Sequence, residues 1–185
     1  MLGIVAAGAV VTFALGGCVG APPQVTVAEG TGLCAPSDGT ETFGFGIPVV
    51  NDGSAAVRLT SADGSASNLD LEGPWVMPAP AGTGFFEAPV FSDTFPPTSE
   101  YAEWDQRSEV DGAELGAGET AYLFWGVTLR AGSQTGTLAR IAVSYDDGWG
   151  EKHSGALGSW FGLAPAPDDP ALGAHCDVPP EPGEG

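Results

Sequence analysis

The chain has few side chains that could act as a catalytic base. Its only histidines are His153 and His175. His153 precedes Ser154, but neighbouring residues of a strand point to opposite faces, so the imidazole is badly placed to activate that hydroxyl. His175 lies in a proline-rich tail, and the sequence has no GxSxG nucleophile elbow. We predict a protein that is not an enzyme, with no catalytic residue and no cofactor.

Side chains that bind metals are also poorly grouped. The cysteines and histidines beyond residue 30 show no CxxC or HxxxH spacing, which zinc sites usually need; they are Cys34, His153, His175 and Cys176. Seven carboxylates fall within residues 100–119, and Asp146, Asp147 and Glu151 surround a turn. Neither group has the spacing of an EF-hand loop. We predict no metal site, while calcium binding by the acidic loops and a carboxylate pair for glycoside hydrolysis stay open.

Tryptophan side chains are the better candidates for binding a ligand. Trp125 alternates with other apolar residues of a predicted strand, which places it in the core. Trp104 and Trp149 lie in predicted loops among acidic residues, where an exposed indole lowers solubility unless it meets a partner. Because a flat indole stacks on a sugar ring, Trp104 and Trp149 are candidate contacts for a wall glycan. The alternative is that both fold back over the end of the domain.

The charge of the chain limits its partners. Asp and Glu number 24 against 5 Lys and Arg, which gives a formal net charge of -19. Such a surface repels phosphate backbones, because affinity for nucleic acid comes mainly from basic side chains. We predict no nucleic-acid partner, and a monomer kept soluble by its charge.

The first residues of the chain form a targeting segment. Residues 2–17 contain no charge and a single hydroxyl, Thr12, as is typical of the apolar region of a signal peptide. The segment ends with Leu15, Gly16, Gly17 and Cys18. These four residues resemble the lipobox of bacterial lipoproteins, in which an aliphatic residue and two small ones precede an acylated cysteine.

The resemblance implies a location and a mode of attachment. Residues 1–17 would be removed, and fatty acyl chains such as palmitate on Cys18 would hold the protein at the extracytoplasmic face of the bacterial cell membrane. A transmembrane anchor and a plain secretory signal are the alternatives. We expect a lipoprotein that acts by binding, or as a structural module, on an envelope protein or wall glycan. The alternative function is an exported carbohydrate-binding or carbohydrate-active module that uses its loop tryptophans.

Two cysteines remain once Cys18 is assigned to the anchor. Export places Cys34 and Cys176 in an oxidising compartment, where a disulfide is expected. Closing so long a loop contributes on the order of 5 kcal/mol in the chain-entropy treatment. We predict that this bridge ties the start of the domain to its end.

The elements that position these residues follow a period of two. Apolar residues alternate with polar or small ones in residues 43–49, 54–60, 68–72, 121–130 and 137–145, and more weakly in 156–164. The fourth run is apolar on both faces, which predicts a central covered strand. In the fifth run, Ala139, Ile141, Val143 and Tyr145 are expected on one face. Gly44 and Gly46 leave one strand face bare, where we expect an internal neighbour rather than a ligand.

Turn residues separate these runs. Asp-Gly occurs five times and favours tight turns. Residues 51–53, Asn-Asp-Gly, predict a hairpin between the first two runs, and residues 146–150 predict the link between the last two strands. Only one or two helical turns are expected in residues 99–115.

Short strands with glycine and proline turns predict an all-β fold. We expect an antiparallel two-sheet sandwich of immunoglobulin-like type with seven to eight strands. The predicted organisation is a signal peptide in residues 1–17 and an acylated Pro/Gly tether in 18–33. They are followed by a sandwich domain in residues 34–176 and a Pro-rich acidic tail in residues 177–185.

Overall fold

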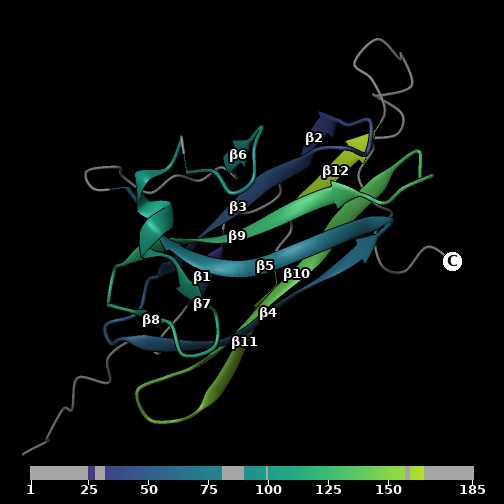
Figure 1. Ribbon diagram of the computed structural model, residues 1–185. Helices are drawn as coiled ribbons and strands as arrows, with labels where there is room; N and C mark the ends of the chain where they lie inside the picture. The colour runs from purple at the N-terminus through teal and green to yellow at the C-terminus, as the bar shows by residue number, and fades with distance from the viewer. Residues whose placement is uncertain (1–24, 28–31, 81–89, 99, 157–158, 165–185) are drawn as a thin grey trace, which may run out of the picture.

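The chain folds into two β-sheets packed face to face (Figure 1). The computed structural model describes residues 25–27, 32–80, 90–98, 100–156 and 159–164. In this part of the chain, most residues lie in strands, and the predicted all-β sandwich of two sheets is confirmed. The described residues form twelve strands rather than seven or eight, because several strands of two to five residues have no alternating pattern long enough to recognise.

The first sheet is built around β9 (Thr120–Leu129). Its strand order is β1 (Val25–Val27), β3 (Thr42–Asn51), β9, β5 (Leu69–Pro78) and β7 (Ser108–Glu109), with β6 (Val90–Ser92) also beside β3. All these neighbours pair antiparallel.

The second sheet is built around β10 (Gly136–Asp146). Its strand order is β2 (Gly32–Pro36), β12 (Trp160–Ala164), β10, β4 (Val57–Ser67) and β8 (Glu114–Leu115), with β11 (Lys152–Ala156) also beside β10. Strands β2 and β12 pair in parallel, and the other neighbours pair antiparallel.

The main core lies between the sheets. Phe45, Ile47 and Val49 of β3 face the second sheet and are fully buried, as the alternation predicts. Strand β9 is buried on both faces, because Trp125 enters this core while Phe124 packs on the outer side of the first sheet. The prediction of a central strand covered on both faces is confirmed.

The outer face of the first sheet is covered by its own aromatic layer. A Cβ placed on Gly44 or Gly46 would lie 2.7 or 2.6 Å from the ring of Phe124, so only glycine lets this ring lie against β3. The predicted internal neighbour of the two glycines is therefore confirmed. The 3-10 helix η1 (Ala102–Gln106) lies over the same face, and Val90 of β6 packs against this layer from the edge of the sheet.

The predicted hairpin at residues 51–53 is wrong. Strands β3 and β4 belong to different sheets, so this turn is an arch that crosses the sandwich. The side-chain amide of Asn51, which is fully buried, donates to the carbonyls of Ala55, Leu115 and Gly116 at 2.8 to 3.0 Å. These bonds hold the chain at the corner where it crosses from the first sheet to the second.

Strand β10 departs from simple alternation. Arg140 adopts a left-handed φ of 52°, and the register with β4 shifts between Ala139 and Ala142. Beyond this β-bulge the phase changes, so that Leu138 rather than Ala139 shares the core face with Ile141. One of the predicted Asp-Gly turns, at Asp63, is likewise wrong, because it lies within β4 opposite the bulge.

The sandwich begins earlier than predicted. Strands β1 and β2 both include residues of the predicted tether 18–33, and Val25 pairs with Asn51 of β3. Val25 is 7% exposed and belongs to the main core. The Val-Thr-Val sequence of β1 suits a strand, because β-branched residues favour extended backbone. Only residues 19–24 then separate Cys18 from the fold.

Several predicted features lie outside the described residues. They are the signal peptide, Cys18, His175, Cys176 and the tail 177–185. Cys34 is disulfide-bonded, and its partner also lies outside the described residues, so pairing with Cys176 stays a prediction. No helix in the described residues is long and apolar enough to cross a membrane.

Candidate functional site at the β10–β11 hairpin

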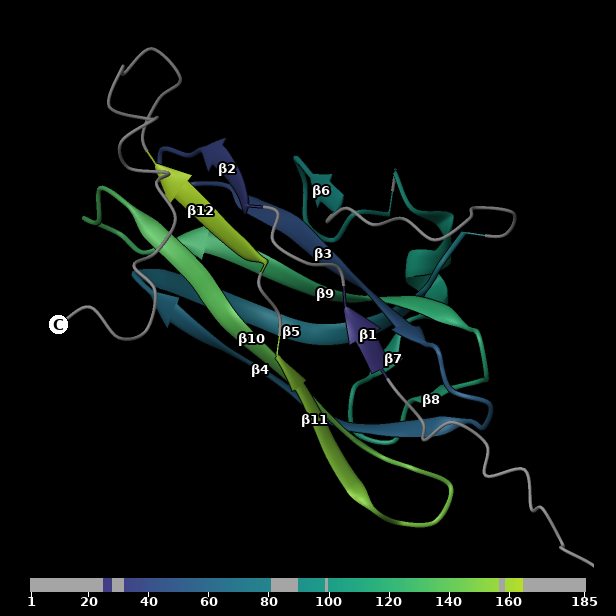
Figure 2. The same ribbon diagram turned by 180° about the vertical axis from the view of Figure 1, so that it is seen from behind.

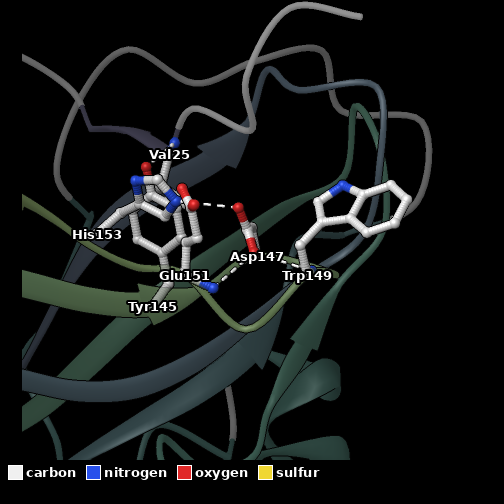
Figure 3. Close-up of polar contacts among 6 residues, drawn as sticks. All are labelled: Val25, Tyr145, Asp147, Trp149, Glu151 and His153. Carbon is white, nitrogen blue, oxygen red and sulfur yellow. Dashed lines mark hydrogen bonds and ion pairs between the residues drawn. The ribbon is translucent and has the colours of Figure 1, made fainter.

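Trp149 is the most exposed large apolar side chain of the described residues. It lies in the loop that joins β10 to β11, whose first pair is Asp146 opposite Lys152. The indole is 89% exposed, and in Figure 3 it stands apart from the other labelled side chains. The predicted turn at residues 146–150 is therefore a hairpin, but it joins β10 to the unpredicted strand β11 rather than to the last strand β12. It presents an aromatic ring to the outside.

Asp147 holds the shape of this loop (Figure 3). Its Oδ1 accepts hydrogen bonds from the backbone N–H groups of Trp149 at 2.8 Å and Glu151 at 2.9 Å. The Asp147 N–H donates to the Glu151 carbonyl, and the Gly150 N–H donates to the Asp147 carbonyl, both at 3.0 Å. Gly150 has a φ of 81°, which an L side chain rarely adopts. The ring of Trp149 is thus carried on an ordered loop.

The surroundings of Asp147 favour its charged form. Its side chain is 6% exposed, and burial by itself raises the pKa of the carboxyl. Hydrogen bonds from the Glu151 N–H, the imidazole of His153 and the Trp149 N–H outweigh that effect, and the coulombic interaction with His153 adds to them. The pKa of Asp147 is therefore lowered from its ordinary value of 3.8.

His153 connects the loop to the N-terminal strand. Its Nε2 lies 3.2 Å from Asp147 Oδ2, and its ring stacks on Tyr145 with centroids 5.2 Å apart. The hydroxyl of Tyr145 accepts a hydrogen bond from the backbone N–H of Val25 at 3.3 Å. A continuous set of contacts thus runs from the hairpin loop to the first residue of β1 (Figure 3).

A cleft of about 270 Å³ adjoins the loop. It is lined by Ala56, Val57, Arg58, Glu114, Asp147 and Gly148. Arg58 lies directly opposite Glu114 on β8 and Asp146 on β10. Asp146 Oδ1 is buried and has no hydrogen-bond partner in the described residues. The cleft therefore offers charged groups of both signs, and Trp149 directly follows Gly148 of its lining.

A second groove of about 450 Å³ lies over the second sheet. It is lined by Thr60, Ser61, Ser144, Lys152, His153 and Ser154. The lining consists of hydroxyl groups with one amine and the imidazole of His153. Unlike the smaller cleft, it has no carboxylate in its lining.

Trp104 is not a surface contact, which corrects one of the two tryptophan predictions. It is 2% exposed and packs edge-on against Trp75, Phe95 and Phe124, with centroids 5.4 to 5.5 Å apart. The guanidinium of Arg107 lies 4.6 Å from its ring centroid. Gly44 and Gly46 of β3 and Gly126 of β9 have no side chains, which leaves space on the outer face of the sheet for the rings of Phe124 and Phe95. Trp104 packs on these rings and is buried despite its acidic neighbours.

The structure brings together one group of metal-binding side chains in its described part. Asp147, Glu151 and His153 each offer an atom within 4.8 Å of the others. Both Asp147 oxygens already accept hydrogen bonds, so the group is accounted for as the brace of the loop. None of the described carboxylates of residues 100–119 joins such a group. His153 and Ser154 occupy successive positions of β11, opposite Tyr145 and Ser144.

The sequence analysis missed the pairing of Asp147 with His153. The signal was present, because an aspartate and a histidine six residues apart flank a Gly-Trp-Gly turn. Once the turn forms a hairpin, the two side chains lie on the same face of the two strands. The hairpin register, which the sequence does not specify, decides this contact.

Comparisons with known proteins bear on the fold alone. Neither the comparison with protein-family models nor the one with curated proteins finds a match. Among solved structures, the chain is similar to the ASH/PapD-like domain of human CEP192 (PapD-like domain 7), with 10% sequence identity and a TM-score of 0.43. The match covers 90% of this chain and 100% of that chain.

Proposed function

We propose that this chain is a lipid-anchored extracytoplasmic lipoprotein that is not an enzyme and acts by binding at the cell envelope. The anchor is supported by the apolar leader and by Leu15-Gly16-Gly17-Cys18 at its end. The binding role is supported by one observation above all, the 89% exposed ring of Trp149 on a braced hairpin loop.

An ordered, exposed tryptophan suits a contact surface. Tryptophan is enriched among the residues that contribute most to binding, because its ring removes a large apolar area from water at a small cost in conformational entropy. Asp147 fixes the loop before any partner arrives, so little ordering remains to be done on binding.

The anchor is tested by the mass of the protein extracted from membranes. We expect the loss of residues 1–17 and the addition of fatty acyl groups at Cys18, and we expect the Cys18→Ala variant to keep its leader and to carry no acyl group. Cys18→Ser, which keeps the size but not the thiol, is the matched control. An extracted chain with an intact leader and a free Cys18 thiol would refute the proposed anchor.

A second candidate function is the binding of a wall glycan. The observation that favours it is the cleft at the base of the hairpin, where Arg58 and Glu114 could bond sugar hydroxyls, while Trp149 follows Gly148 of the cleft lining and could stack on the sugar ring. Titration with soluble wall glycans should then change the tryptophan emission of the wild type but not of Trp149→Phe. Identical titrations of the two proteins would exclude Trp149 as a sugar platform.

A further inference from the structure

We infer that the Trp149 hairpin rests on the surface of the same bilayer that carries the acylated Cys18. The inference depends on the proposed lipid anchor. It names the partner of the exposed ring as the interfacial region of the lipid, and it follows from the length of chain before β1 and from the place where β1 enters the fold.

The free tether is short. A tether ending at residue 33 would hold the domain well away from the membrane, but β1 pairs with β3 from Val25 onward. Seven Cα steps then separate Cys18 from Val25, which span at most about 25 Å when fully extended. The end of the sandwich that carries Val25 must therefore stay close to the lipid.

That end of the sandwich also carries the hairpin. The Val25 N–H bonds the Tyr145 hydroxyl at 3.3 Å, and a Cβ on Gly155 of β11 would lie 3.5 Å from the Val25 carbonyl oxygen. Figure 2 shows β1 lying beside β11, with the β10–β11 loop extending beyond them. Trp149 follows Tyr145 by only four residues, which span at most about 14 Å.

The chemistry of the loop suits the interface between lipid and water. Tryptophan gathers at that level of a bilayer because its ring is apolar and its N–H stays hydrogen-bonded. The net charge of -19 opposes adsorption of the whole surface on anionic lipid. Two of the chain's five basic residues, Arg58 and Lys152, flank Asp146 at the base of the hairpin and reduce the negative charge there.

A weak contact is sufficient when the anchor holds the two surfaces together. A short tether gives the loop a high effective concentration at the bilayer, so the ring needs little affinity of its own. The braced loop adds to this, because its geometry is set by Asp147 rather than by the lipid. The contact would fix the orientation of the domain and direct its opposite end away from the membrane.

The test uses the acylated protein in phosphatidylcholine vesicles. The emission of Trp149 is isolated as the difference between the wild type and Trp149→Phe. Its quenching by acrylamide is compared with that of a Cys18→Ser protein produced without residues 1–17, which carries no acyl group, in the absence of vesicles. We expect quenching to fall several-fold on vesicles, and we expect lipids brominated near the headgroup to quench the ring. Equal acrylamide quenching in the two states would overturn the inference.

The tether supplies the matched control. A flexible Gly/Ser insertion several times longer than residues 19–24 should restore most of the acrylamide quenching, because it lowers the effective concentration of the loop at the bilayer. Retained protection with the long tether would overturn the geometric basis of the inference. A soluble glycan that quenches Trp149 with equal strength on and off vesicles would assign the ring to a sugar instead.

The mass of the same sample separates the two possible failures. An acylated chain whose Trp149 stays accessible refutes this inference and leaves the proposed anchor standing. A chain that carries no acyl group refutes the anchor, and this inference fails with it.

Discussion

Two tryptophans with similar sequence surroundings have opposite fates in this fold. Trp104 is flanked by Glu103 and Asp105, and Trp149 is followed at two residues by Glu151. Trp104 is nevertheless 2% exposed, whereas Trp149 is 89% exposed. Local polarity therefore does not decide whether a ring is buried.

The difference lies in what each ring can cover. Trp104 on η1 meets a sheet face whose glycines leave room for aromatic rings, and a Cβ on Gly126 would lie 2.7 Å from Phe95 in the same layer. Trp149 lies beyond the last paired residues of β10 and β11, where no sheet lies beneath it. A loop aromatic side chain is thus buried when an uncovered sheet face lies within its reach. It stays exposed when the loop holds the ring away from every such face.

The largest effect is expected for Trp104→Ala. Removing a buried indole from the layer over the first sheet should lower the free energy of unfolding by about 3 to 5 kcal/mol. Denaturant unfolding followed by circular dichroism measures this loss. Trp104→Phe should cost less because it keeps a ring in the layer, and a Trp104→Ala loss below about 1 kcal/mol would mean that this layer is not a true core.

The close packing of Phe124 on the glycines of β3 can be tested by adding a single methyl group. A Cβ on Gly46 would lie 2.6 Å from both Phe124 and Val90, so Gly46→Ala should cost about 1 to 3 kcal/mol through overpacking. Gly148→Ala in the hairpin loop is the matched control, because its Cβ would come no closer than 3.9 Å to the Ala56 carbonyl oxygen. Equal unfolding midpoints for the two variants would contradict the proposed need for glycine beneath Phe124.

The sequence predicts the long strands and the sandwich well, since alternation marks the half-buried strands and a doubly apolar run marks β9. It does not predict the partner of each strand. The Asn51 turn has the chemistry of a hairpin, yet its amide bonds Leu115 and Gly116, which lie far along the chain. Short strands such as β1 form only because a longer neighbour offers an edge, so local pattern alone cannot reveal them.

The site was predictable to a smaller degree. The exposed Trp149 follows from its Gly-Trp-Gly turn, which contains nothing to fold the ring back. The burial of Trp104 depends on its packing against Phe124, whose ring lies on Gly44 and Gly46 of β3, so segments far apart in the sequence must meet. The brace of Asp147 and His153 depends on hairpin register.

A smaller effect is expected for Asp147→Asn in the hairpin. The folded-state pKa of Asp147 lies below its ordinary value of 3.8, so its charge stabilises the fold above that pH. The contribution is lost as pH falls through the lowered pKa. The difference in unfolding free energy between wild type and variant should be constant near neutral pH and should shrink below about pH 3.8. A difference that grows on acidification would contradict this sign.

The smallest effect on stability is expected for Trp149→Ala. The ring is 89% exposed, so its removal should change the free energy of unfolding by no more than about 0.5 kcal/mol. The backbone N–H of residue 149 still donates to Asp147 in the variant, so the rate of amide exchange at this position should be unchanged. Hydrogen exchange and denaturant unfolding check both expectations. A loss of several kcal/mol would mean that the ring packs on the fold. An unchanged stability would show that the exposed indole has no structural role, which the proposed contact surface requires.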